Sequence, residues 1–83
     1  MEDEREVGKV THFFTRASVA AIMLTAPVAV GENLVFRGAT TDFEQVIGSM
    51  QIDKQNIEQA EAGQEIGVKV QDRVRQGDTV YKK

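Results

Sequence analysis

The stretch Phe43-Glu44-Gln45-Val46-Ile47-Gly48-Ser49-Met50-Gln51-Ile52 shows the clearest alternation of apolar and polar residues in the chain. From Val46 onward the even-numbered positions are apolar or small, and the odd-numbered positions are polar except for Ile47. A period of two is typical of a β-strand with one face on a core and one face in water. The stretch therefore predicts a strand over residues 43–52 within an antiparallel sheet.

Further short strand-like runs, separated by turn residues, lie on both sides of this stretch. They cover residues 7–14, 18–25, 34–37, 65–71 and 79–82. The alanines of residues 18–25 would suit a helix equally well. We predict a strand there, because Pro27 and Gly31 follow within helix-breaking distance. One helical stretch is predicted at Asp53–Gly63, where Ile57 and Ala60 are three residues apart and Gly63 can terminate the helix.

These elements predict an all-β fold, a small closed antiparallel β-barrel with one short helical turn. Closure would remove the exposed sheet edges that so short a chain could hardly protect otherwise. The four phenylalanines are expected mostly in the core, with Phe13 as the one candidate for an exposed stacking platform. The core is predicted to contain Val10, Ile22, Leu34, Phe36, Val46, Met50, Ile66, Val68 and Val80.

Length and composition indicate one soluble domain. The 83 residues allow a single core, which we place in residues 7–83 behind a disordered acidic leader at residues 1–6. The chain has no cysteine and one histidine, so a disulfide, a thiolate nucleophile and a zinc site are not expected. The longest uncharged stretch, residues 17–31, is shorter than the ~20 residues that span a bilayer, and the acidic start differs from a signal peptide. A cytoplasmic location without membrane contact is expected.

Four stretches, in a fixed order, resemble a known family. They are Val7-Gly8-Lys9-Val10, Val30-Gly31-Glu32-Asn33-Leu34, the segment from Ala60 to Val68, and the segment from Val74 to Tyr81. Together they resemble the second, β-barrel domain of translational GTPases such as elongation factor Tu. In that factor a glutamate precedes the methionine aligned with Met50 and helps to hold the terminal adenosine of tRNA. Ser49 stands there in this chain, so the terminal-adenosine site is not carried over.

A closer likeness is to stand-alone elongation-factor-like proteins and to the C-terminal barrel of collagenase-like peptidases that act in RNA modification. It rests on Thr41-Asp42-Phe43-Glu44-Gln45-Val46, on Ser49-Met50-Gln51-Ile52 and on the ending Val80-Tyr81-Lys82. The resemblance implies a non-catalytic accessory barrel that works with the translation or RNA-modification machinery.

Signatures of catalysis are missing from the sequence. No G-x-x-x-x-G-K-[ST] motif is present, so a bound nucleotide is not expected, and neither is another cofactor or a metal. His12 and Ser18 lack a third orienting group, and His12 is expected as a partly buried histidine bonded to the backbone. Glu58 and Glu61 lie in a polar segment, which is typical of a solvated face. We therefore predict that the chain is not an enzyme.

Two functions remain open from the sequence. The first is binding of tRNA or another structured RNA, with Lys69, Arg73 and Arg75 as phosphate contacts. The net charge of −3 and a pI near 5.0 are unlike those of a dedicated nucleic-acid domain. The alternative is a protein-interaction barrel that docks onto a separately encoded enzyme or a ribosome-associated factor.

Overall fold

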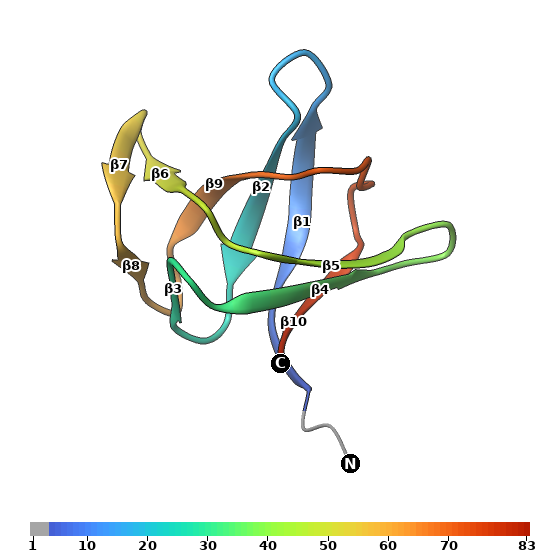
Figure 1. Ribbon diagram of the computed structural model, residues 1–83, viewed down its shortest axis with the longest axis horizontal. Helices are drawn as coiled ribbons and strands as arrows, with labels where there is room; N and C mark the ends of the chain where they lie inside the picture. The colour runs from blue at the N-terminus through green and yellow to red at the C-terminus, as the bar shows by residue number, and fades with distance from the viewer. Residues whose placement is uncertain (1–3) are drawn as a thin grey trace.

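The computed structural model describes residues 4–83, and its regular elements are all β-strands (Figure 1). Eight strands form one antiparallel sheet in the order β5-β4-β10-β1-β2-β9-β6-β7, and β3 pairs with β8 in a separate two-stranded sheet. Residues 4–83 hold no helix with the length and apolar character that a membrane crossing needs. The strands are β1 (Arg5–Phe14), β2 (Val19–Leu24), β3 (Val28–Ala29), β4 (Asn33–Arg37), β5 (Asp42–Val46), β6 (Met50–Ile52), β7 (Gln55–Ile57), β8 (Gln59–Ala60), β9 (Glu65–Lys69) and β10 (Thr79–Lys82).

The large sheet is strongly curled but does not close, so the predicted closed barrel is corrected to a half-barrel (Figure 1). Its end strands β5 and β7 each pair on one side only. The gap beside β5 is bridged by a side chain instead of a backbone ladder. The Gln45 amide donates to the Lys69 carbonyl at 2.8 Å, and its oxygen accepts from the Gln71 N–H at 2.8 Å. The Gln71 side chain donates in turn to the Glu44 carbonyl at 3.2 Å.

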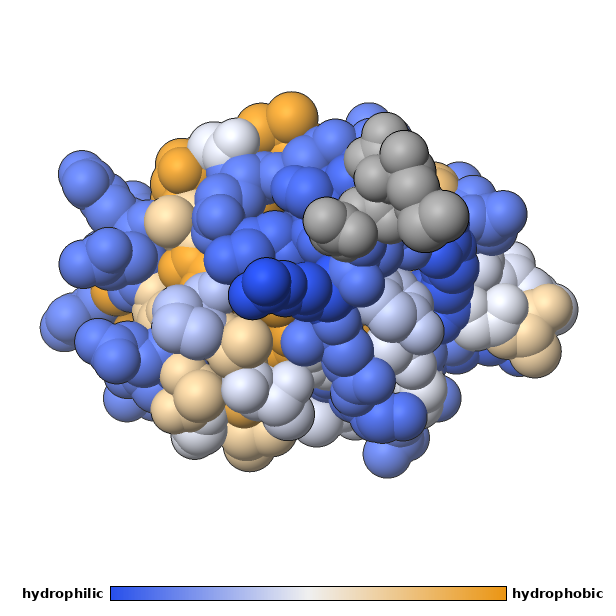
Figure 2. Space-filling model, turned by 90° about the horizontal axis from the view of Figure 1, so that it is seen from below, coloured by the Kyte–Doolittle hydropathy of each residue, from blue (hydrophilic) through white to orange (hydrophobic). Residues whose placement is uncertain are grey.

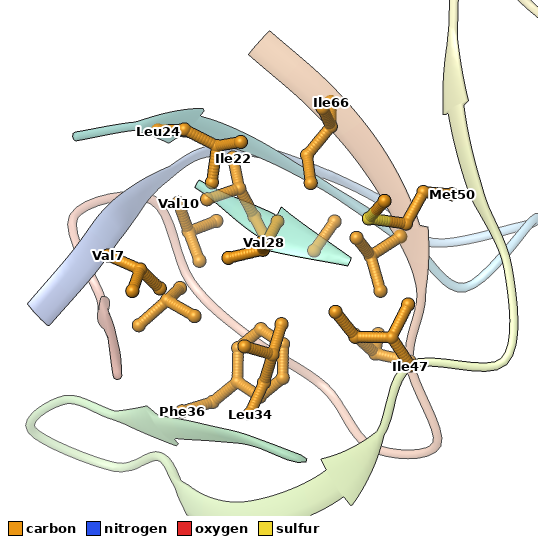
Figure 3. Packing of buried hydrophobic residues seen from close by; sticks show 14 of the residues in the cluster. Val7, Val10, Ile22, Leu24, Val28, Leu34, Phe36, Ile47, Met50 and Ile66 are labelled. Atoms are coloured by element: carbon orange, nitrogen blue, oxygen red, sulfur yellow. The ribbon is translucent and has the colours of Figure 1, made fainter. Parts of the chain in front are cut away.

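The concave side of the curled sheet encloses a single apolar core (Figure 3). Phe36 and Ile22 are fully buried there, and Phe43 stacks on Phe36 with ring centroids 5.0 Å apart. Every predicted core residue except Val46 is buried, which confirms most of the predicted inward positions. Val46 is instead 58% exposed, and its neighbour Ile47 is 1% exposed.

The predicted strand over residues 43–52 is wrong as one element. It divides into β5, which ends at Val46, and β6, which begins at Met50. The Ile47 N–H continues the pairing beside β4 by donating to the Glu32 carbonyl at 2.9 Å, and the chain then turns through Gly48 and Ser49. The turn breaks the period of two. Ile47, the one apolar residue at an odd-numbered position from Val46 onward, is therefore the buried residue.

The predicted helix at Asp53–Gly63 is also wrong, because this segment forms strands. β6 and β7 make a hairpin in which Ile52 pairs with Gln55 across the two turn residues Asp53 and Lys54. Both turn residues have positive φ, 51° and 66°, as a type I′ turn requires. Beyond Glu58 the chain pairs with β3 as β8, which uses the backbone groups that a helix would have bonded internally.

β1 begins before the predicted start of the domain. Arg5 pairs with Lys82 and Glu6 with Tyr81, so these two residues belong to the sheet and not to a disordered leader. Glu4 forms an ion pair with Arg37. Residues 1–3 of the predicted leader lie outside the described residues. The N-terminal strand therefore lies in the middle of the sheet, between β10 and β2.

Candidate functional site

The predicted cations Arg73 and Arg75 flank a buried residue in the segment between β9 and β10. Val74 is 1% exposed and packs in the core, whereas both arginines are exposed. Because the Val74 side chain points inward, the side chains of its neighbours Arg73 and Arg75 leave the backbone on the solvent side. The local fold therefore presents Arg73 and Arg75 to solvent on either side of one anchor.

Buried and capping carboxylates hold the backbone of this segment. The Arg75 N–H donates to the Asp78 carboxylate at 2.9 Å, and the Asp78 N–H donates to the Arg75 carbonyl at 3.0 Å. Asp78 is 6% exposed and lies against Gly38, where a Cβ atom would fall 1.9 Å from a carboxylate oxygen. The Arg73 N–H donates to the Asp72 carboxylate at 2.8 Å. Position 38 therefore requires glycine, because a Cβ atom there would clash with the Asp78 carboxylate. That carboxylate accepts the hydrogen bond from the Arg75 N–H.

Both arginines line one pocket of about 360 Å³ at the tip of the β4–β5 hairpin. Neither guanidinium forms an ion pair within residues 4–83. Two arginine forks beside threonine hydroxyls are suited to bind an oxyanion such as phosphate. Two acids also line the pocket, so its charge is balanced. The other lining residues are Thr40, Thr41, Asp42, Phe43 and Asp72.

Lys69 does not line this pocket. It ends β9 and lines a different hollow with Gln45, Val46 and Gly48. Lys69 pairs with Val19, which pairs in turn with Phe14. The three predicted phosphate contacts are therefore divided between two places in the fold. Sequence reasoning missed Thr40 and Thr41, which a hairpin tip after Gly38 could have suggested.

A β-bulge in β1 places the aromatic residues differently from the prediction. Val10 pairs with Ile22 and His12 with Ala21, so Thr11 is the extra residue. The bulge reverses the faces of the strand, so Phe13 packs against the core while Phe14 is 51% exposed. His12 is exposed rather than partly buried, and its ring lies 4.4 Å from that of Phe14. The exposed aromatic residue is Phe14, not Phe13.

Ion pairs cover the outer face of β4, β5 and β10. Arg37 pairs with Glu4, which raises the pKa of the guanidinium. Lys83 approaches Glu44 at 3.1 Å, and the hydrogen bonds from Lys83 and Asn33 hold the pKa of that carboxyl below its usual value. Hydrophilic residues cover much of the face seen in Figure 2. No group of three or more acids and histidines in residues 4–83 is arranged to hold a metal ion.

Comparison with known proteins relates the chain to proteases. No family model matches it. Over 77 residues it is 40% identical to an uncharacterized protease of Methanocaldococcus jannaschii, a match that covers 92% of this chain and 19% of the protease. A collagenase of Porphyromonas gingivalis is 31% identical over 78 residues, which cover 92% of this chain and 22% of the collagenase. The chain is homologous to a domain of collagenase-like proteases.

A solved structure shows the same fold. The crystal structure of the C-terminal domain of a "putative U32 peptidase" from Geobacillus thermoleovorans superimposes with a TM-score of 0.88 at 18% identity. The match covers 100% of this chain and 98% of that one. The predicted likeness to the C-terminal domain of collagenase-like peptidases is confirmed, although this domain is a half-barrel and not a closed barrel, whereas the likeness to translation factors stays a prediction. The chain spans about a fifth of the length of the curated relatives it matches.

Proposed function

We propose that this collagenase-like domain is an accessory RNA-binding module of the cytoplasm, in which Arg73 and Arg75 contact phosphates of a structured RNA. The observation that carries the proposal is that both arginines line one pocket and their guanidinium groups form no ion pair within residues 4–83. Their backbone N–H groups are held by Asp72 and Asp78, so ordering on binding is needed mainly in the arginine side chains.

The balanced charge of the pocket limits the expected affinity. Asp42 and Asp72 stand beside the arginines, and the whole chain has a net charge of −3. Long-range attraction for RNA is therefore weak, and contact has to come from the arginine forks themselves. Binding is accordingly expected at low salt and is expected to fall steeply as salt rises.

The test measures binding of fluorescently labelled tRNA by anisotropy at several salt concentrations. Changing Arg73→Ala together with Arg75→Ala should weaken binding and lower the slope of log affinity against log salt by about 0.7–0.9 for each lost phosphate contact. The matched control changes Arg5→Ala and Lys9→Ala, which removes two exposed cations outside the pocket. Equal binding by the double variant and the wild-type protein would refute the proposal.

A second candidate function is docking onto another protein domain. It is favoured by the comparison, because in the curated relatives the matching segment is 19–22% of a longer protein and has further chain beside it. The exposed Val46 and Phe14 side chains could pack against such a neighbour. An apolar interface of this kind would be almost indifferent to salt, which separates it from phosphate binding.

A further inference from the structure

One row of residues crosses the outer face of β1, β2 and β9. Phe14 pairs with Val19, and Val19 pairs with Lys69. Residues directly opposite in antiparallel strands share a face of the sheet. Phe14 and Lys69 therefore lie on the same face, two strand spacings or about 10 Å apart. An exposed ring and an exposed ammonium group thus form the two ends of one short row.

The middle of the neighbouring row is hollow because Ala21 and Gly67 have little or no side chain there. His12 pairs with Ala21, and Ala21 pairs with Gly67, which pairs with Gln51 of β6. A pocket of about 300 Å³ lies over Ala21 and Gly67, with Phe14 and Gln51 among its lining residues. The Gln51 amide donates to the Asn56 side chain at 3.0 Å. The hollow is thus lined by an aromatic ring and by an amide that can form further hydrogen bonds.

The outer face of β4, β5 and β10 differs, because there ion pairs lie beside a buried apolar residue. There Val35 is 3% exposed, although it is flanked in the sheet by Glu44 and Tyr81 and not by the core. The ion pairs Glu4–Arg37 and Lys83–Glu44 lie on that face and cover it. Phe14 receives no comparable cover, since the ring that lies against it belongs to the exposed His12.

The chemistry of this face fits a nucleobase. A flat ring with a polar edge can stack on Phe14 while its edge meets the Gln51 amide. Lys69 forms no ion pair within residues 4–83 and can contact the adjoining phosphate. Two acids, Asp53 and Glu65, and one cation, Lys54, also line the pocket. The Glu65 carboxylate accepts a hydrogen bond from the Thr11 hydroxyl at 2.5 Å. A base inside a duplex is stacked on both sides, so only an unpaired base can reach the ring.

We propose that the face formed by Phe14, Ala21, Gly67, Gln51 and Lys69 binds an unpaired RNA base, with Phe14 stacking on the base and Lys69 contacting its phosphate. This inference rests on the proposed RNA-binding function and deepens it. It assigns duplex or structured RNA to the arginine pocket and single-stranded RNA to the sheet face. The two surfaces use different residues, so variants can separate them.

The experiment measures binding of a labelled eight-nucleotide single-stranded RNA and of a labelled hairpin RNA with few unpaired bases. Phe14→Leu should weaken single-strand binding about 5- to 100-fold and leave duplex binding nearly unchanged. Phe14→Tyr should retain single-strand binding, and Lys69→Ala should lower the salt slope by about 0.7. Val30→Ala is the matched control, because it also shortens an exposed apolar side chain and Val30 does not border Phe14, Gln51 or Lys69. Thermal unfolding of each variant verifies the fold.

A spectroscopic readout reports stacking directly. The chain has no tryptophan, so Phe14→Trp introduces a single indole whose emission should be quenched by single-stranded RNA and not by the hairpin. Unchanged single-strand binding by Phe14→Leu, or no quenching at saturation, would overturn the inference while leaving the arginine pocket untouched. Loss of duplex binding in the Arg73 and Arg75 variant alone would support the proposed function separately. No binding of either RNA by the wild-type protein at low salt would overturn both.

Discussion

Asp53 and Lys54 illustrate how single residues decide local structure in this chain. Both adopt the left-handed region of φ, at 51° and 66°, to complete the β6–β7 hairpin. For residues with a Cβ atom this conformation brings Cβ close to the next carbonyl, at a cost of roughly 1–2 kcal/mol for each residue. Glycine adopts it without that contact, and asparagine tolerates it better than most residues.

Changing Lys54→Gly should therefore stabilise the protein by about 1 kcal/mol. Urea denaturation at neutral pH measures the change, and the hairpin chemical shifts verify that the turn is kept. Gln55→Gly is the control, because Gln55 lies in β7 and is not among the residues with positive φ. It should destabilise by roughly 0.5–1 kcal/mol. If Lys54→Gly also destabilises, Lys54 does not hold a left-handed conformation in the turn.

Among the elements, the contact between β5 and the end of β9 is the most unusual. Here Gln45 places a carboxamide where a neighbouring strand would place a peptide group, donating to Lys69 and accepting from Gln71. Each such hydrogen bond contributes about 0.5–1.5 kcal/mol when formed. The side chain therefore joins two parts of the sheet that have no backbone pairing with each other.

Gln45→Ala should lower the free energy of unfolding by about 1–3 kcal/mol. Hydrogen exchange of the Gln71 amide should accelerate in the same variant, because its acceptor is lost. The control is Gln55→Ala, since Gln55 is exposed and its side chain forms no hydrogen bond within residues 4–83. Protection of the Gln71 amide that survives the change would contradict this role of Gln45.

The sequence predicts the strands better than the way they are joined. Alternation correctly identified the inward residues Ile66 and Val68, since the strand that carries them runs without interruption. The bulge at Thr11 was missed because one extra residue leaves no compositional trace, yet it exchanges the two faces of the strand. The prediction of a closed barrel was wrong for a related reason, since pairing between distant strands depends on the curl of the whole sheet.

The sequence predicted the candidate site only in part, again because local alternation shows in a sequence and an irregular backbone does not. Arg73 and Arg75 meet in one pocket because the buried Val74 lies between them, a pattern that is visible in the sequence. Lys69 shares the basic segment but belongs to a strand, so its side chain follows the sheet. Phe14 became accessible only through the bulge. Local alternation was therefore informative, and residues displaced by irregular backbone were not predictable.

For the molecule as a whole, the ion pair between Glu44 and Lys83 makes the stability of the fold depend on pH. The pKa of Glu44 is below its usual value of 4.5, chiefly because Lys83 donates to its carboxylate and also because Asn33 does. A carboxyl with a lowered pKa in the folded state stabilises that state above its unfolded pKa. This stabilisation is lost as pH falls through the folded value.

When the pH falls below about 5, the Glu44→Gln variant should therefore lose less free energy of unfolding than the wild-type protein does. Urea unfolding at successive pH values measures the difference. The difference is expected to be small, because an exposed pair is screened by water. Glu58→Gln serves as the control, since Glu58 forms no ion pair within the described residues. Identical acid profiles for the Glu44 variant and the wild-type protein would contradict this assignment.

The pairing of β1 with β10 gives the domain a further property. Arg5 lies opposite Lys82, so the first and last strands run side by side through the middle of the sheet. A short linker could join them, and the chain could then be opened at the exposed turn between β1 and β2. Such a circular permutant should fold, and the same adjacency would let the domain be inserted into a surface loop of a host protein without spreading the insertion points apart.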